Sequence, residues 1–225
     1  MLPPAPPALA DLLAYFGPLA SERAEVAGGV ALHTPGVNVL GLNAAFLPGA
    51  APERLREAAA WQRSRGYPPL VAVPGRVGGA GEEIASLRCG VYRADPSPSP
   101  LTAEQVSRLH LPRWAAVIAE AHGTPEWGSA LARHLGRVLE GRRDYTLLLA
   151  YAGSEAVGAL LWQAAGAGGR AHLWGTLDPA VDGALLNGAA TLGEFLLASV
   201  PSTSPISVVE AEEVSFFLMK GDGNP

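Results

Sequence analysis

The segments Tyr145-Thr-Leu-Leu-Leu-Ala-Tyr151, Ala156-Val-Gly-Ala-Leu-Leu-Trp-Gln163 and Arg170-Ala-His-Leu-Trp-Gly-Thr-Leu177 decide the fold. Each is apolar, has the length of a strand, and is separated from the next by a glycine-containing turn. Turns this short join neighbouring strands in antiparallel order. The sequence therefore predicts a three-stranded antiparallel meander in this part of the chain.

An apolar stretch follows the meander. Residues from Gly183 to Ser199 are apolar all round, which predicts a buried helix. Ile206–Glu210 then has the character of a strand, and Glu212–Met219 that of a final helix. A strand, a helix and a strand in this order form a crossover whose two strands are parallel. We therefore expect an α+β fold in which the sheet is mixed.

A proline-rich segment, 94–100, predicts a boundary between two units, 1–95 and 96–225, because alternating prolines interrupt helices and inner strands. In the second unit, helices are expected from Thr102, with Gln105 completing a capping box, and from Thr124. In the first unit the patterns predict helices at Ala8–Phe16 and Pro52–Arg65, and strands at Val26–His33, Val37–Leu42, Leu70–Val73 and Leu87–Tyr92.

Composition excludes several classes of protein. The formal charge of −5 disfavours a nucleic-acid partner, which requires clustered Lys and Arg. Cys89 is the single cysteine, so no intrachain disulfide can form, and the five dispersed histidines indicate no metal site. The first ten residues lack the pattern of a secretory signal, and the apolar tract of the meander is interrupted at Gly153–Glu155. We expect a cytoplasmic protein without a membrane span.

The order of elements resembles the GNAT acyl-CoA N-acyltransferase fold. Ala171–Leu177 is similar to the fourth strand of that family, and Asp178–Gly183 to the loop that leads into its acyl-CoA-binding helix. Ile206–Glu210 and Val214–Phe217 resemble its fifth strand and the start of its last helix. The first unit resembles the degenerate first unit of tandem members, on the segments Leu42–Asn43 with Phe46, Pro52–Leu55, Arg65–Pro68, Leu70–Pro74 and Arg88–Tyr92. Trp114 and Glu120-Ala-His-Gly-Thr124 are similar to the opening helix and loop of the second unit.

The resemblance implies two GNAT-like units in tandem and an N-acetyltransferase-like activity. The co-substrate would be acetyl-CoA or another acyl-CoA, and the acceptor an amine on a small molecule or peptide. The fourth and fifth strands would splay to admit pantetheine, which the backbone at Thr176 and Leu177 would hold. Three small or polar residues at the start of the helix would face the diphosphate: Gly183, Asn187 and Gly188. Backbone N–H groups at a helix N-terminus bind anions. Candidate bases are Glu210, Glu212 and His172.

Several residues depart from the family pattern and keep a second reading open. Asp182 stands where the family has a basic residue or Gln, Leu185 and Asn187 stand at its glycine positions, and Phe216 or Phe217 replaces its tyrosine acid. The alternative is a catalytically degenerate GNAT-fold protein, serving as a structural or partner-binding module. It predicts a filled groove and an exposed apolar surface for a homodimer. Each candidate base also has a structural explanation. Glu210 and Glu212 would favour the N-terminus of the last helix, and His172 would be a packed residue of its strand. The chain also lacks the family's two last strands, a place that Leu87–Tyr92 is expected to fill.

Overall fold

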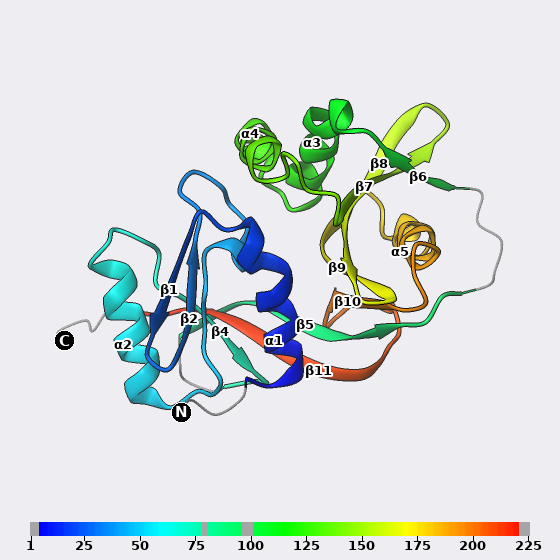
Figure 1. The fold of residues 1–225 in the computed structure, drawn as a ribbon. Helices are drawn as coiled ribbons and strands as arrows, with labels where there is room; N and C mark the ends of the chain where they lie inside the picture. The colour runs from blue at the N-terminus through cyan, green and yellow to red at the C-terminus, as the bar shows by residue number, and fades with distance from the viewer. Residues whose placement is uncertain (1–4, 78–80, 96–100, 221–225) are drawn as a thin grey trace. The chain divides into compact units, whose positions relative to one another are not determined.

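Figure 1 shows the computed structural model of the chain, which describes residues 5–77, 81–95 and 101–220. Within these residues, hydrogen bonding joins eleven strands into a mixed sheet in the order β1-β2-β3-β4-β11-β5-β10-β9-β8-β7-β6. The expected α+β class is confirmed. Leu87–Tyr92 was predicted to complete the sheet of the second unit. The strand order agrees with this prediction, because β5 (Glu82–Tyr92) adjoins β10 (Leu196–Pro201).

Contacts divide the chain into two compact units. The first comprises the described residues of Met1–Cys89, Pro201–Ser204 and Ala211–Pro225, and the second those of Gly90–Val200 and Pro205–Glu210. The division at Cys89 and Gly90 falls close to the proline-rich segment 94–100, most of which lies outside the described residues. The difference is the last strand, β11 (Val208–Leu218), most of which returns to the first unit.

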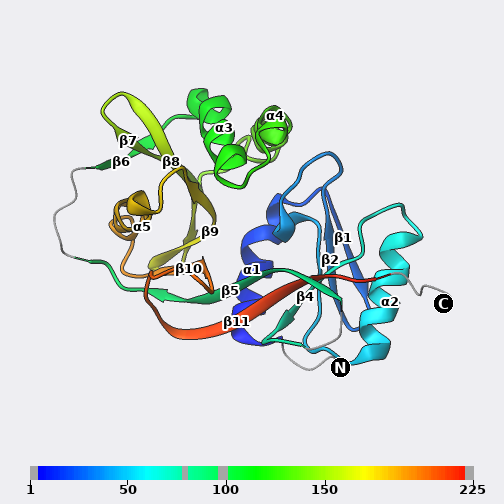
Figure 2. The same ribbon diagram turned by 180° about the vertical axis from the view of Figure 1, so that it is seen from behind.

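The first unit contains two parallel strands joined by a helix. A hairpin of β1 and β2 turns at Ala27 and Gly28, both of which have positive φ, as such turns require. Strand β3 pairs antiparallel with β2 and parallel with β4, and β11 pairs antiparallel with β4. In Figures 1 and 2, α1 and α2 lie on opposite sides of these strands. The elements are α1 (Pro7–Phe16), β1 (Glu22–Val26), β2 (Gly29–His33), β3 (Ala45–Phe46), α2 (Pro52–Arg63) and β4 (Leu70–Pro74).

The second unit is built on the predicted meander. Strands β7, β8 and β9 pair antiparallel in sequence order, β6 adds antiparallel to β7, and β10 adds parallel to β9. Figures 1 and 2 show α3 and α4 on one face of this sheet and α5 on the other. The elements are β6 (Thr102–Val106), α3 (Leu111–Ala121), α4 (Gly128–Val138), β7 (Tyr145–Ala152), β8 (Glu155–Ala165), β9 (Gly168–Thr176), α5 (Asp182–Ala190) and β10.

Four predicted elements of the second half needed correction. The helix expected over Gly183–Ser199 is a shorter helix, α5, followed by strand β10. The strand predicted at Ile206–Glu210 begins at Val208 and continues through the helix predicted at Glu212–Met219. Both segments form one strand, β11, whose Val, Phe and Ser residues pair with β4 far earlier in the sequence. The residues from Thr102 form strand β6, which pairs with β7 over five residues, and the helix begins only at Leu111.

Two strand predictions in the first unit also needed correction. Val26–His33 contains a turn and belongs to two strands, and Val37–Leu42 forms no strand but ends in a 3₁₀ turn at Leu40–Leu42. The short strand β3 follows instead. The side chain of Asn43 explains the path: its amide donates to the carbonyls of Val37 and Val39, at 2.7 and 3.1 Å, and so holds the loop in a non-extended form.

Candidate functional site

A β-bulge interrupts β9 in its middle. Leu161 of β8 pairs with Leu173, whereas Gln163 pairs with Arg170, so Ala171 and His172 together lie opposite Trp162. Two residues facing one is the definition of a bulge, which bends its strand and ends regular pairing. The position of the bulge affects the pairing of β9 with β10, because β10 borders β9 on the side away from β8.

The parallel strands β9 and β10 separate at this bulge. They pair over three positions, from Leu196 with Gly169 to Ala198 with Ala171, and pairing ends there although both strands are fully described. β9 continues to Thr176 and β10 to Pro201. The expected divergence of two parallel strands beside a buried helix is therefore confirmed. The second strand of the pair is β10, and not Ile206–Glu210 as predicted.

The edge of β9 beyond the bulge carries backbone groups that β10 does not pair. The N–H of Leu177 donates to the carbonyl of Val157 at 2.8 Å, so the backbone groups of Leu177 face β8. Because successive residues of a strand alternate, the backbone groups of Thr176 point to the open side. The carbonyl of Trp174 accepts from Nε2 of His122, at 3.0 Å, since a carbonyl can only accept. Leu177 itself is 38% exposed.

The helix that follows begins beside this edge. Asp178 caps a 3₁₀ turn by accepting from the N–H of Ala180 at 2.9 Å, and α5 starts at Asp182. The first-turn N–H groups of a helix carry partial positive charge. A Cβ added to Gly183 would meet no atom within 4 Å, so the backbone there is open to a ligand. The structure thus places Gly183 one turn beyond the open end of β9.

Asp182 is a half-buried acid at the start of this helix. Its carboxylate accepts a hydrogen bond from the hydroxyl of Thr176. Burial raises the pKa of Asp182, the hydrogen bond from Thr176 lowers it, and the charge of Asp178 raises it, with burial the largest of the three. Asp182 therefore takes up a proton at a higher pH than an exposed aspartate does.

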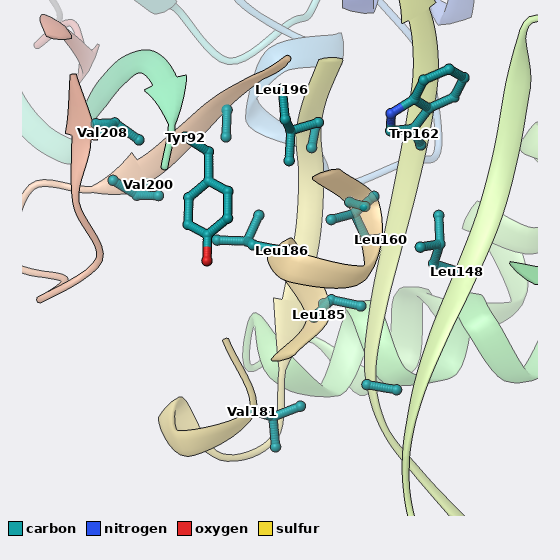
Figure 3. Packing of buried hydrophobic residues seen from close by; sticks show 14 residues of the cluster. Tyr92, Leu148, Leu160, Trp162, Val181, Leu185, Leu186, Leu196, Val200 and Val208 are labelled. Carbon is teal, nitrogen blue, oxygen red and sulfur yellow. The ribbon is translucent and has the colours of Figure 1, made fainter. Parts of the chain in front are cut away.

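The inner face of α5 packs into an apolar core. Figure 3 shows Leu185 and Leu186 among side chains of the surrounding strands, and both are fully buried. Leu185 therefore packs against the sheet and does not project toward the loop. The core also contains Tyr92, Leu148, Leu160, Trp162, Val181, Leu196, Val200 and Val208.

Two of the residues expected at a diphosphate are engaged elsewhere. The side chain of Asn187 accepts from the hydroxyl of Tyr92 at 2.9 Å and from the N–H of Asp95 at 3.0 Å, and donates to the carbonyl of Asp95 at 2.8 Å. A Cβ added to Gly188 would lie 2.5 Å from Cβ of Ala103 in β6. Among the predicted binding residues, the structure gathers Thr176, Leu177 and Gly183 at the loop, while these two fasten α5 to its neighbours.

The three candidate bases are scattered over different surroundings. His172 is a bulge residue of β9 and is 8% exposed. Glu210 lies in β11, is exposed and has φ of 53°. Glu212 belongs to the first unit, where its Oε2 accepts from the N–H of Ala8, at 2.9 Å, in the first turn of α1. The structural reading of Glu212 as a helix N-terminal carboxylate holds, although the helix is α1 and not the expected last one.

The comparison of Phe216 and Phe217 with the family's tyrosine rested on a helix that the structure does not contain. Both residues lie in β11, are buried, and pair with Ala72 and Val71 of β4. They therefore do not occupy the place of a general acid.

In the described residues no group of three His, Cys, Asp or Glu side chains is arranged to hold a metal ion. No helix of this part of the chain is both long and apolar enough for a membrane span.

Sequence reasoning missed three residues at the parted strands: Trp174, Ser199 and His122. The indole Nε1 of Trp174 donates to the carbonyl of Ser199 at 2.8 Å, across the gap between β9 and β10. Ser199 fell within the helix predicted over Gly183–Ser199, and Trp174 stood out only as one residue of an apolar strand. His122 had one available signal, because it lies in the Glu120–Thr124 segment that resembles the family.

Comparison with known proteins supports the fold. No family model and no curated protein matches the chain. Among solved structures, a GCN5-related N-acetyltransferase from Kribbella flavida aligns with a TM-score of 0.58 over 96% of each chain, at 15% identity. A GNAT-family protein from Novosphingobium aromaticivorans aligns at 0.54 over 95% of this chain and 97% of its own, at 13% identity.

A third structure, a functionally unknown conserved protein from Staphylococcus epidermidis, gives a TM-score of 0.56 at 9% identity, covering 85% of this chain and 91% of its own. Likeness at such identities establishes architecture alone. The chain has a GNAT fold.

Proposed function

We propose that this chain is an acyl-CoA-dependent N-acyltransferase, with acetyl-CoA or another acyl-CoA as co-substrate and an amine of a small molecule or peptide as acceptor. The observation that carries the proposal is the separation of β9 and β10 at the Ala171–His172 bulge, beside the N-terminus of α5. A gap between parallel strands leaves backbone donors and acceptors available to the two amide groups of a pantetheine arm.

Some residues at the gap favour binding of acyl-CoA, and others oppose it or take no part in it. The open edge at Thr176 would hold pantetheine, and the exposed backbone of Gly183 would meet the diphosphate. Leu177, expected beside Thr176, bonds instead to β8. Asn187 and Gly188, also proposed for the diphosphate from sequence, would contribute by fixing α5 rather than by contact. Asp182 opposes the anion, by about 0.3–1 kcal/mol for a charge at a helix end. We therefore expect weak to moderate affinity for CoA.

When bound, acyl-CoA would supply an activated thioester. The acceptor nitrogen would bond to its carbonyl carbon as the bond to sulfur breaks, and CoA would leave as a thiolate that takes up the proton released from the amide nitrogen. A base on the chain would take the proton that the ammonium loses. His172 is carried by the strand that borders the gap, whereas Glu210 and Glu212 lie on β11. A base contributes about 10²–10⁴-fold, and the holding of amine and thioester together contributes an effective molarity of about 10⁵ M or more.

The first unit supports the finer proposal of two GNAT-like units in tandem. Its strands β1, β2 and β3 pair antiparallel in order, and α2 then leads to β4, which is parallel to β3. The second unit repeats this pattern in β7, β8, β9, α5 and β10. The loop before α2 carries Pro48, and α2 itself begins at Pro52, which is in keeping with a degenerate unit.

The second candidate is the catalytically degenerate module, with a partner or a second copy of the chain as its ligand. Two observations favour it: the indole of Trp174 spans the gap, and Asp182 stands at the helix start. Binding of CoA without release of free CoA thiol in the presence of a panel of primary amines would support this reading over the enzyme.

Isothermal titration calorimetry with acetyl-CoA and CoA tests the proposal. A saturable heat with a dissociation constant in the micromolar to low millimolar range is expected, together with a rise in melting temperature. The absence of both at millimolar ligand would remove the support for an acyl-CoA site. The base is then identified with H172N, E210Q and E212Q, because loss of the base lowers kcat and alters the pH profile of kcat, which the loss of a purely structural contact would not do.

A further inference from the structure

The carbonyl of Ser199 points toward β9, into the gap. The carbonyl of Phe195 accepts from the N–H of Gly169 at 2.9 Å, so it faces β9. Residues at a spacing of two share a side of a strand, and Ser199 lies four residues further along. Had the parallel pairing continued, an N–H of β9 would have reached this carbonyl. The bulge at Ala171 and His172 removes that donor.

The indole of Trp174 supplies the missing donor. Its Nε1 lies 2.8 Å from the carbonyl of Ser199, and the partly buried ring packs against the apolar core of the second unit. A buried carbonyl without a partner would cost free energy, so the contact has a physical reason. The contact joins the two strands at the point where they part.

We propose that the indole of Trp174 is a plug, which closes the gap between β9 and β10 and must leave for a pantetheine arm to enter. This inference rests on the proposed acyl-CoA function. An amide N–H of pantetheine would take over the hydrogen bond to the carbonyl of Ser199. The apparent affinity for CoA is then reduced by the fraction of molecules in which the indole has left. Trp174 thereby lowers the apparent affinity for CoA.

The test is calorimetry with CoA on the wild type, W174F, W174L and W127F. W174F keeps an aromatic ring and loses the N–H donor, so it is expected to bind CoA about two- to tenfold more tightly than the wild type, the range set by one net hydrogen bond. W174L opens the gap further and is expected to bind at least as tightly as W174F. W127F makes the same chemical change outside the gap, and its affinity should equal that of the wild type.

Tryptophan fluorescence supplies a readout that is independent of affinity. If the indole leaves its partly buried site, CoA shifts the emission of the wild type and of W127F, and this shift is lost in W174F. A melting curve for each variant establishes that it is folded, and W174L serves if W174F is not.

The outcomes separate the two ideas. Binding of CoA by the wild type, with W174F and W174L no tighter, overturns the plug and leaves the proposed function standing. Binding by W174F but not by the wild type supports the plug in its strongest form. A failure of all four proteins to bind at millimolar CoA overturns the proposed function and, with it, the plug.

Discussion

The hydroxyl of Thr176, at the end of β9, donates a hydrogen bond to the carboxylate of Asp182, the first residue of α5. The bond spans the loop at which the parted strands meet the helix. It partly offsets the burial that raises the pKa of Asp182. The same pair therefore governs the electrostatics of the candidate diphosphate site and the pH dependence of stability.

Replacement D182N should make stability less dependent on pH in the acid range. Because the folded pKa of Asp182 lies above its unfolded value, its protonated form stabilises the fold below the unfolded pKa, and this contribution is lost as pH rises through the folded pKa. The free energy of unfolding of D182N, relative to wild type, should thus rise with pH and level off above the folded pKa. Urea titrations from pH 3 to 8 measure this difference.

T176V provides the matched variant, because it removes the donor that favours ionised Asp182 and keeps the side chain's shape. It should steepen the pH dependence that D182N flattens. A flat difference between D182N and wild type across the range would contradict this account. In calorimetry with CoA, D182N should bind about two- to fivefold more tightly, as expected for a charge removed from a helix N-terminus.

Glu212 is expected to act on stability. Its carboxylate accepts from the N–H of Ala8, and no side chain of the adjoining N-cap residue, Pro6, does so. E212A should therefore cost about 0.5–2 kcal/mol of unfolding free energy, the range for a lost helix N-terminal acceptor. E212Q keeps an acceptor oxygen and should cost about 0.3–1 kcal/mol. Denaturant titration measures both.

The exposed Glu210 supplies the control for this prediction, since a surface substitution such as E210A usually changes stability by about 0.5 kcal/mol or less. An E212A variant that melts like the wild type but has lost acyl transfer would assign Glu212 to catalysis instead.

The thiol of Cys89 should be unreactive in the folded protein. It is 4% exposed, and burial, with the charges of Asp11 and Glu212 adding to it, raises its pKa to about 12. The thiolate that attacks disulfide reagents is therefore scarce at pH 8. Ellman's reagent should label the native chain far more slowly than the chain in denaturant, where one thiol per chain reacts, as the single cysteine requires.

C89S serves as the blank for this measurement. Complete labelling of the native protein within minutes at pH 8 would show that the site opens readily and would contradict the burial of Cys89. Because the folded pKa is the higher one, the neutral thiol also favours folding, and that contribution should be lost as pH rises from about 9.0 toward 12.

The meander was predictable because its signals are local. Glycines at positive φ, such as Gly153 and Gly166, mark its turns, and the strands between them are continuous apolar runs. The division of α5 from β10 was not predictable, because the stretch is nearly all apolar and shows no clear period. What separates them is a packing constraint: a Cβ at Gly193 would lie 2.8 Å from Cα of Gly168. That neighbour is 25 positions away in the sequence.

The site itself depends still more on distant partners. β11 contains several glutamates, and its part from Glu212 is predicted as a helix, yet its pairing with β4 determines that it is a strand. The bulge at Ala171 and His172 contains no glycine or proline, so no residue type announces it. Resemblance placed the loop into the helix at Asp178–Gly183, where the structure has a 3₁₀ turn and the first residues of α5. It could not show that Trp174 reaches Ser199, since that contact requires the position of β10.

Two glycines of α5 offer a matched test of which end of the helix meets the ligand. A Cβ at Gly183 would have open space, whereas one at Gly188 would collide with Cβ of Ala103 at 2.5 Å. G183A should therefore leave stability unchanged or raise it by up to about 1 kcal/mol, through helix propensity. G188A should destabilise the protein by about 1–3 kcal/mol, because an overpacked contact forces α5 or β6 to shift. Chemical denaturation separates the two variants.

The effect on CoA should be the reverse of the effect on stability. A methyl group at Gly183 would stand where the diphosphate approaches the backbone, so G183A should weaken CoA binding by about tenfold or more, as the loss of a charge-assisted hydrogen bond would. G188A should bind CoA with nearly wild-type affinity at temperatures where it remains folded, because that side of α5 faces β6. If G183A instead binds like the wild type, the diphosphate lies elsewhere, and the N-terminus of α5 is only the start of a buried helix.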